Sequence, residues 1–352
     1  MPEAPRFEHG LIIGKFYPLH VGHNHLIRTA LTQCRSVTVE LLASVVESIP
    51  VEVRADWIRQ EHPTVTLRTA MDEAEVDFAS DAAWDAHMEL IESLLPAPVD
   101  AVFSSDEYGA ELATRLGATW VQVDKGRVAN PVHGRRIRDD VAGNWSSLSS
   151  PTREWMSRRV VVLGAESTGS TTLAEALAAA YETAWVPEYG REYTEIREGG
   201  LTAPWLTHEF DLIADRQQAM EREAARSSPR PLLLCDTDLF ATTLWHERYL
   251  GERVPRLEAR AAEHRPILYI LTGDEIPFVQ DGMRDGEHIR HAMQDRFREA
   301  LAAQPVPWLE VRGSVAERVA AARPAIDAAL AESLVFALPL ELRSTPVDTL
   351  SP

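Results

Sequence analysis

The sequence predicts an α/β protein with two parallel-sheet domains, and three features of the 352-residue chain support this prediction. Short apolar runs alternate with amphipathic stretches, which is typical of strands covered by helices on both faces. This alternation starts twice, at residues 11–13 and again at residues 159–163, and each start leads into a glycine-containing turn. Between the two halves, residues 146–151 are polar and turn-rich, which predicts a linker.

The first half, residues 1–150, is expected to form a doubly wound, Rossmann-like sheet. Apolar runs predict its strands at residues 11–13, 37–44, 65–69, 101–104 and 120–123. Helices are expected between them, at residues 23–33, 51–61, 81–95 and 110–116. The carboxyl ends of such strands lie along one edge of the sheet, where open α/β folds bind ligands.

The second half, residues 156–335, is expected to form another parallel α/β domain. Its predicted strands are residues 159–163, 232–235, 267–271 and 308–311, with helices between them. No motif of the first half recurs, so the chain is not an internal repeat. Residues 336–352 hold three prolines among mixed polar residues, and they predict a disordered tail or a surface strap.

Composition and charge restrict the functions open to this chain. It is 45% hydrophobic and 25% charged, as in ordinary folded proteins, and its formal net charge of -19 disfavours nucleic-acid partners. Cys34 and Cys235 lie far apart in apolar surroundings and are expected to be reduced core residues. The sequence shows no signal peptide and no membrane-spanning apolar run, so we expect a cytoplasmic protein without a membrane partner. A homo-oligomer is compatible with the sequence.

Residues 14–23, Gly-Lys-Phe-Tyr-Pro-Leu-His-Val-Gly-His, follow the first apolar run and predict a phosphate-handling turn. A helix that begins near Gly22 would point its backbone N–H groups and the positive end of its dipole at this turn. His20 and His23 would flank it with imidazole donors, and Lys15 would add a fixed positive charge. None of these side chains is a good covalent nucleophile, so direct attack of one bound substrate on another is the simplest chemistry.

This pattern closely resembles the HxGH signature of the nucleotidyltransferase superfamily. Members of that superfamily transfer AMP or CMP from a nucleoside triphosphate to a phosphate on a partner substrate. The resemblance implies that Lys15, His20 and His23 stabilise the triphosphate during this transfer.

Two further loops and a tryptophan narrow the resemblance to the nicotinamide mononucleotide (NMN) adenylyltransferases. Ser105 follows one predicted strand, and Asp124 and Arg127 follow the next. Trp84 stands where such enzymes often carry an aromatic residue that stacks on the pyridine ring, although core packing explains a lone tryptophan equally well. The resemblance implies NMN binding by Trp84 and ATP binding by Gly14, Phe16, Tyr17, Gly22, Ser105, Asp124 and Arg127.

Residues 131–138, the last segment that matches the family, depart from its pattern. Such families have Ser-x-Thr-x-x-Arg or Ser-Gly-Thr-x-x-Arg at the start of a helix, where two hydroxyls and an arginine grip the triphosphate. Arg138 matches the arginine, but His133 and Arg135 replace the two hydroxyl residues. Positive charge is kept or increased, and a basic surface loop is the alternative interpretation. The resemblance adds Arg138 to the catalytic residues His20, His23 and Lys15.

The second half opens with a strand that runs into Gly-Ala-Glu-Ser-Thr-Gly-Ser-Thr-Thr-Leu at residues 164–173, whose glycines are five apart as in a P-loop. Such a loop wraps backbone N–H groups around phosphates. Ser170, however, stands where P-loops carry the lysine that bridges the β- and γ-phosphates, and no lysine follows Lys125. The predicted nucleotide-binding residues are Gly164, Glu166, Ser167, Thr168, Gly169, Ser170, Thr171 and Thr172.

Later motifs agree with a P-loop kinase. A buried strand ends in Asp236 and Asp238, which suit Mg²⁺ contact or a substrate hydroxyl, so Thr171 and Asp236 are candidate metal ligands. The remaining candidate substrate or magnesium residues are Glu188, Tyr189, Arg191, Asp281 and Arg284, and the arginine-bearing segment 290–298 is similar to a lid. In their order these motifs resemble the nicotinamide riboside kinase domain that follows the adenylyltransferase in bacterial bifunctional NAD-salvage proteins. The helix-turn-helix repressor domain that precedes these domains in some relatives is not expected here.

The resemblance implies phosphorylation of nicotinamide riboside to NMN, then transfer of AMP from ATP to NMN, giving NAD and pyrophosphate, with Mg²⁺ as cofactor. Because Ser170 removes a charge that would stabilise the transition state, the kinase reaction is expected to be weak or absent, with Arg284 or Arg290 as partial substitutes. Two alternatives stay open. The partner substrate could be another phosphate ester such as phosphopantetheine or FMN, or the P-loop half could sense nucleotide or act as a scaffold without turnover.

Overall fold

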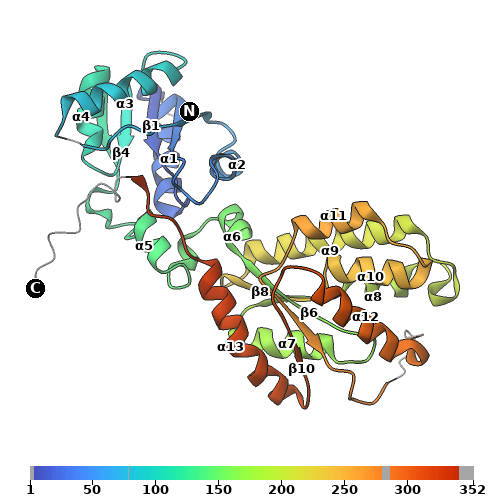
Figure 1. The fold of residues 1–352 in the computed structure, drawn as a ribbon. Coiled ribbons are helices and arrows are strands. Elements are labelled where there is room, and N and C mark those ends of the chain that lie inside the picture. Colours follow the sequence, from blue (N-terminus) through green and yellow to red (C-terminus); the bar gives the residue numbers. More distant parts are fainter. Residues whose placement is uncertain (1–3, 78, 280–285, 341–352) are drawn as a thin grey trace, which may run out of the picture. The chain divides into compact units, whose positions relative to one another are not determined.

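The computed structural model describes residues 4–77, 79–279 and 286–340, and the chain divides into two compact units. The first unit comprises residues 1–152 and 335–352, and the second comprises residues 153–334. Each unit contains one five-stranded sheet in which every described pairing is parallel (Figure 1). The prediction of two parallel α/β domains is therefore confirmed.

The sheet of the first unit has the strand order β3-β2-β1-β4-β5. Its strands are β1 (Phe7–Gly14), β2 (Cys34–Ala43), β3 (Thr66–Met71), β4 (Ala101–Ser104) and β5 (Thr119–Gln122). Its helices are α1 (Val21–Gln33), α2 (Val51–Glu61), α3 (Asp81–Leu94), α4 (Tyr108–Leu116) and α5 (Gly134–Asp139). The order reverses at β1, which pairs with β2 on one side and β4 on the other. The loops after β1 and β4 thus flank the position where open parallel sheets bind ligands.

Helix α3 shows how the sequence builds the covering layers of this unit. Ser80 caps its start by accepting a hydrogen bond from the Ala83 backbone N–H at 3.3 Å. Trp84, Met88 and Ile91 recur at helical spacing and pack against Leu11 and Leu42 of the sheet in one buried cluster. This packing fixes α3 on the sheet beside the carboxyl end of β1.

Glu40 lies in the middle of β2 between Ile13 of β1 and Arg68 of β3, and it is fully buried. Neither of its carboxylate oxygens has a hydrogen-bond partner in the described part of the chain. Burial raises the pKa of Glu40 from its ordinary 4.5 to about 8, although the positive charge of Arg68 lowers it in part. The first sheet thus contains an acid that is favoured in its neutral form.

Replacing Glu40 by methionine, which keeps the unbranched shape, is expected to stabilise the first unit increasingly as pH rises. Between pH 4.5 and 8 the folded state retains a proton that the unfolded chain releases, so the parent loses stability across this window. The stability gap between Glu40→Met and the parent should be small at pH 5 and on the order of 2 to 5 kcal/mol at pH 8. Urea unfolding at both pH values measures it, with the exposed Glu52→Met as control. An equal gap at pH 5 and 8 would contradict the buried-acid interpretation.

The sheet of the second unit has the strand order β10-β9-β6-β8-β7. Its strands are β6 (Arg158–Leu163), β7 (Ala184–Val186), β8 (Leu232–Asp236), β9 (Leu268–Thr272) and β10 (Trp308–Val311). Its helices are α6 (Ser150–Met156) at the unit boundary, α7 (Ser170–Tyr181), α8 (Tyr189–Ile196), α9 (Thr207–Ser227), α10 (Leu239–Leu250), α11 (Pro255–Glu263), α12 (Arg290–Ala302) and α13 (Val315–Ser333). Short 3-10 turns occur at Lys125–Arg127, Trp145–Ser147, Gly200–Thr202 and Glu287–Ile289.

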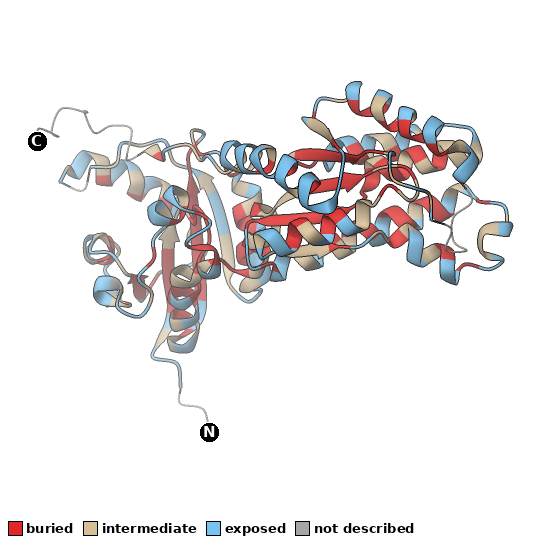
Figure 2. Ribbon diagram, turned by 90° about the horizontal axis from the view of Figure 1, so that it is seen from below, coloured by how far each residue is buried: buried red, intermediate tan, exposed pale blue. Residues whose placement is uncertain are grey.

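Both faces of this second sheet are buried, which explains the continuous apolar runs of its strands. Val161 and Leu163 of β6 face a cluster that includes Phe297 of α12, whereas Val160 and Val162 face a cluster that includes Leu173 of α7. Figure 2 shows the central strands as the most continuously buried segments. Cys34 and Cys235 are buried free thiols, as the sequence indicates.

The structure adds three details to the sequence-based expectations. The edge strand β7 was missed because its three residues are too short to show a periodicity. Residues 146–151, expected as a linker, form the end of a 3-10 turn and the start of α6. Residues 335–340 return to the first unit, where the Ala337 backbone N–H donates to Ser48 Oγ at 3.1 Å. Among the helices of the described residues, none combines the length and apolar character needed to cross a bilayer.

Candidate active sites

A cavity of about 570 Å³ lies at the carboxyl ends of β1 and β4 in the first unit. It is lined by most of the residues that the sequence singled out in this half. These are Gly14, Lys15, Phe16, Tyr17, His20, Gly22, His23, Trp84, Ser105, Asp124 and Arg138. Arg127 ends the 3-10 turn Lys125–Arg127, and its side chain lies outside the described part of the structure.

The two histidines lie face to face at the start of α1. Their rings stack with centroids 3.8 Å apart, and Phe16 packs against His23 at 4.9 Å. His20 caps the helix, because its Nδ1 accepts a hydrogen bond from the Gly22 N–H at 3.1 Å. A Cβ at Gly22 would lie 3.0 Å from the His20 ring, so a glycine suits this close approach. Since Nδ1 accepts, the neutral His20 ring carries its proton on Nε2, where it can be donated.

Lys15 is positioned by a buried acid on the loop after β2. Its Nζ lies 3.3 Å from Glu47 Oε1, and Glu47 also binds the buried Arg54 at 2.6 Å. Arg54 in turn donates to the Lys15 carbonyl at 2.9 Å. One carboxylate therefore contacts both cations, and this network holds Lys15 at the cavity wall. Sequence reasoning did not find Glu47 or Arg54, because neither belongs to a local motif.

Arg138 of α5 is fixed against the turn after β1. Its guanidinium donates to the Tyr17 carbonyl at 2.6 Å and lies 4.7 Å from the centre of the Tyr17 ring. A Cβ at Gly134 would lie 2.7 Å from the Tyr17 carbonyl oxygen, so a glycine permits this approach. His133 caps α5 through Nδ1, which accepts from the Arg136 N–H at 3.2 Å. The histidine that replaces the expected serine thus performs the capping task of a hydroxyl residue.

Asp124 lines the cavity, but its carboxylate binds backbone N–H groups of its own loop. Its carboxylate accepts from the backbone N–H groups of Ala129 at 2.8 Å and Asn130 at 2.9 Å. These bonds hold the pKa of Asp124 below its ordinary value. Asp124 therefore stabilises the conformation of loop 124–130, whether or not it also contacts ATP.

Trp84 is both a core residue and a wall of the cavity. It is 5% exposed, and Arg115 covers its ring at 5.5 Å. Near it, His87 Nδ1 lies 2.7 Å from Asp72 Oδ2 and His87 Nε2 lies 3.1 Å from the Glu75 carbonyl. Two acceptors require both ring nitrogens to donate, which favours the imidazolium, and the bond to Asp72 raises the pKa of His87. His87 and Asp72 also line the cavity, and no sequence motif indicated this pair.

The returning segment 335–340 closes one side of the first cavity. Pro339 and Leu340 line it, Phe336 packs edge-on against Tyr17 at 6.5 Å, and the Tyr17 hydroxyl donates to the Ala337 carbonyl at 3.1 Å. Residues near the end of the chain therefore contribute to the site formed by the beginning of the chain.

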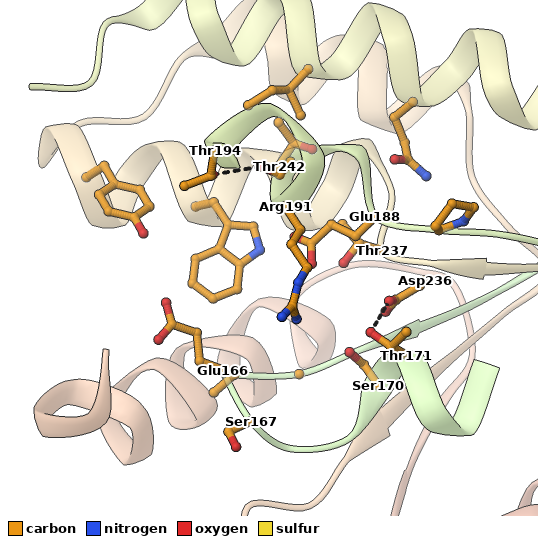
Figure 3. A pocket seen from close by; sticks show the side chains of 18 of the residues that line it. Glu166, Ser167, Ser170, Thr171, Glu188, Arg191, Thr194, Asp236, Thr237 and Thr242 are labelled. Carbon is orange, nitrogen blue, oxygen red and sulfur yellow. Dashed lines mark hydrogen bonds between the residues drawn. The ribbon is translucent and has the colours of Figure 1, made fainter. Parts of the chain in front are cut away.

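A second cavity of about 420 Å³ lies over the predicted P-loop in the second unit (Figure 3). It is lined by most of the residues predicted there. These are Gly164, Glu166, Ser167, Gly169, Ser170, Thr171, Thr172, Glu188, Arg191 and Asp236. Asp281 and Arg284 lie outside the described residues.

The loop between β6 and α7 has the backbone of a phosphate-binding turn. Ser167 and Gly169 have positive φ values of 60° and 85°, and α7 begins at Ser170. Thr168 faces inward, where its hydroxyl donates to the Ala165 carbonyl at 2.7 Å and accepts from Thr272 at 2.7 Å. Thr168 thus braces the loop from beneath and does not line the cavity.

Thr171 and Asp236 meet at the carboxyl ends of the strands. The Thr171 hydroxyl donates to Asp236 Oδ2 at 2.5 Å, while Asp236 Oδ1 is buried without a hydrogen-bond partner in the described residues. A hydroxyl beside a carboxylate fits Mg²⁺, which takes few protein ligands and completes its shell with phosphates and water. The described residues contain no group of three or more His, Cys, Asp or Glu side chains that could hold a metal ion.

Glu188 faces Asp236 across this cavity. Burial and the nearby charge of Asp236 raise the pKa of Glu188 to about 8, whereas Arg191 acts in the opposite direction. The pKa of Asp236 is raised as well, chiefly by burial. The two carboxyl groups therefore retain a proton near neutral pH when no cation is bound.

Besides Thr168, two more of the predicted residues described in this half do not line the cavity. Asp238 is a helix cap, which accepts from the Ala241 N–H at 3.2 Å and from the Tyr269 hydroxyl at 3.0 Å. Tyr189 is buried in an aromatic cluster, and its backbone N–H binds Gln217. The spacing of these residues in the sequence did not reveal that their side chains pack elsewhere.

The far wall of the second cavity is aromatic. Trp205, Phe210, Trp245 and Tyr249 line it, and they come from α9, α10 and the loop before α9. Sequence reasoning missed this wall because its members are scattered over 45 residues without a motif. An aromatic wall opposite a phosphate-binding loop suits a flat ring that carries a phosphate acceptor.

Comparisons with known proteins agree with this architecture. Residues 159–318 match the family described as "AAA domain". The chain is 27% identical over 325 residues to the "Trifunctional NAD biosynthesis/regulator protein NadR" of Escherichia coli K12, covering 86% of this chain and 78% of that protein. It is 26% identical over 324 residues to the protein of the same name from Salmonella typhimurium LT2, with the same coverage.

Solved structures show the same two-domain fold. The structure titled "Crystal structure of NadR protein in complex with NR" aligns with a TM-score of 0.69 at 20% identity, over 98% of both chains. The structure titled "Crystal structure of NadR protein in complex with NAD and AMP-PNP" aligns with a TM-score of 0.65 at the same identity and coverage. These comparisons agree with the expectation of an enzyme that carries a P-loop domain. Over most of its length, the chain is similar to the NadR proteins of NAD biosynthesis and shares their fold.

Proposed function

We propose that the first cavity transfers AMP from ATP to the 5′-phosphate of NMN, giving NAD and pyrophosphate. The observation that carries this proposal is the gathering of His20, His23, Lys15 and Arg138 around one cavity at the carboxyl edge of the sheet. The similarity to proteins named for NAD biosynthesis supports NMN as the partner substrate. Trp84 offers an aromatic surface on the same cavity for the pyridine ring.

In the proposed step, an oxygen of the NMN phosphate attacks the α-phosphorus of ATP. A new P–O bond forms as the bond from this phosphorus to the pyrophosphate oxygen breaks, and pyrophosphate leaves with the electron pair. His20 Nε2–H, His23, Lys15 and Arg138 stabilise the negative charge on the triphosphate, and the start of α1 adds its dipole. Mg²⁺, when bound, would supply further charge neutralisation on the phosphates. Rate enhancement comes from positioning and electrostatics, without a covalent enzyme intermediate.

For the second cavity, we propose binding of ATP over the P-loop and of nicotinamide riboside against the aromatic wall. Phosphoryl transfer there would form a bond from the riboside 5′-oxygen to the γ-phosphorus and break the bond to ADP, while the hydroxyl proton passes to Glu188. Thr171 and Asp236 would hold Mg²⁺. The neutral Ser170 supports the alternative that this unit binds nucleotide as a sensor, without turnover.

Product analysis of the full chain tests both proposals, since the two reactions release different products. With ATP, Mg²⁺ and NMN we expect NAD and pyrophosphate in equal amounts, and phosphopantetheine and FMN in parallel reactions test other phosphate esters. Nicotinamide riboside in place of NMN should yield ADP if the second unit is a kinase. Absence of NAD at high enzyme concentration would refute the first proposal, and absence of ADP would favour the sensor.

A further inference from the structure

The second cavity needs a cation for the terminal phosphate of its nucleotide, because Ser170 contributes none. The phosphoryl oxygens are negatively charged, and during transfer negative charge grows on the oxygen that bridges the β- and γ-phosphates. P-loop proteins stabilise this charge with a lysine at the position of Ser170. Ser170 begins α7 directly after Gly169, so its side chain holds the place of that lysine. The structure therefore raises the question of which residue supplies the missing charge.

Arg191 is the one basic side chain among the described residues that line this cavity. Figure 3 shows its guanidinium pointing toward the phosphate-binding loop, between Glu166 on one side and Ser170 on the other. Arg191 and Ser170 both lower the pKa of Asp236 against the larger effect of burial, so both act on the same carboxylate. The cation and the serine thus lie at the same end of the cavity.

Three other arginines contact the loop, but they do not line the cavity. Arg290 donates to the Ser167 carbonyl at 3.1 Å, Arg318 donates to the Thr168 carbonyl at 2.6 Å, and Arg248 binds Glu166 at 2.7 Å. Arg290 and Arg318 are buried, the Arg248 side chain is 8% exposed, and none of the three lines the cavity. Arg290 is one of the two arginines that the sequence analysis expected to replace the P-loop lysine. It contacts the backbone of the loop but does not line the cavity.

Arg191 occupies a position that helix stability does not favour. It lies in the first turn of α8, where the helix dipole disfavours positive charge. It also faces Glu166, Glu188 and Asp236, three acids around a space that would receive phosphates. A guanidinium can bridge such acids and then bind two phosphate oxygens in a bidentate manner.

We infer that Arg191 contacts the terminal phosphate of the nucleotide bound at the P-loop, taking the role of the lysine that is absent at position 170. This inference rests on the proposed binding of ATP in the second cavity. It holds whether the unit transfers the phosphoryl group or only senses the nucleotide, because both require the same contact. Arg191 is planar and permanently charged, and it would reach the terminal phosphate from α8. A lysine at position 170 would reach the same phosphate from α7.

Nucleotide binding to the full chain by isothermal titration calorimetry, with Mg²⁺ and a two-site analysis, tests the inference. Arg191→Ala should weaken ATP binding at one of the two sites about tenfold or more, while AMP binding stays unchanged, because only the terminal phosphate loses its partner. The double variant Arg191→Ala with Ser170→Lys should recover most of the lost affinity, since it restores the cation from α7. Arg230→Ala is the matched control, because Arg230 is an exposed surface arginine of the same unit paired with Glu182.

Three results would overturn the inference. These are unchanged ATP binding in Arg191→Ala, an equal loss for ATP and AMP, or no recovery in the double variant. The parent chain separates the inference from the proposed function. A parent that binds ATP at two sites but forms no ADP from nicotinamide riboside refutes the kinase, while the binding series still decides the role of Arg191. If the parent binds ATP at a single site and Arg191→Ala leaves that site unchanged, the inference fails.

Discussion

His20→Asn is expected to lower the turnover of AMP transfer by about two to three orders of magnitude while the protein stays folded. Asparagine is a good helix cap, so it can replace His20 Nδ1 as the acceptor for the Gly22 N–H. It cannot replace the Nε2–H donor at the cavity. The substitution therefore separates the structural role of His20 from its chemical role, and NAD formation from ATP and NMN measures the chemical one.

His20→Ala serves as the comparison, because alanine removes both the donor and the cap. We expect the same loss of turnover together with a stability loss of about 1 kcal/mol or more. Thermal unfolding and circular dichroism distinguish the two variants. If His20→Asn retained the parental rate, the histidine would be a helix cap alone and the proposed mechanism of the first cavity would fail.

Asp236→Asn is expected to lower Mg²⁺-dependent ADP formation by about two orders of magnitude or more, and to leave NAD formation from NMN unchanged. The asparagine oxygen can still accept the Thr171 hydroxyl, so local packing is retained. The variant lacks the charge that a divalent cation requires. Coupled assays for ADP and for pyrophosphate on the same preparation measure both reactions. If the parent forms no ADP, the Mg²⁺ dependence of ATP binding at the second site is the readout.

Asp238→Asn is the informative companion to this variant. Asp238 is two residues away and was predicted with Asp236 from the same motif, but the structure makes it the cap of α10. Because asparagine also caps helices, Asp238→Asn should retain ADP formation and ATP binding. Equal losses in both variants would show that the strand end as a whole, and not the Asp236 carboxylate, governs the second cavity.

Several parts of this protein could be predicted from local sequence, because their physical cause is local. The apolar runs of β1, β2, β4, β6, β8 and β9 mark buried parallel strands, since both faces of such strands are covered. The two phosphate-binding turns are contiguous segments, so the residues of each turn meet whenever a strand and a helix flank them. His20, His23, Ser170 and Thr171 were found for this reason.

Residues that meet only through long-range packing were missed. Glu47 fixes Lys15 from another loop, and Asp72 pairs with His87 across fifteen residues of sequence. The wall built by Pro339 and Leu340 lies more than 300 residues from the turn that it covers. No periodicity or spacing records such contacts, because they depend on where folded elements come together.

The direction in which side chains point was also not predictable from the sequence. Asp236 and Asp238 are equivalent in sequence, yet one faces the P-loop cavity and the other caps a helix. Arg290 was one of the two arginines expected to replace the P-loop lysine, yet Arg191 lines the cavity and Arg290 does not.

The sequence by itself determined the two parallel sheets, the two turns proposed to bind phosphate and the serine at position 170, because each follows from a short contiguous pattern. The tertiary structure decided which acids and cations share a cavity, because packing over long distances places them. In the second unit, this packing places Arg191 of α8 on the wall of the cavity over the P-loop.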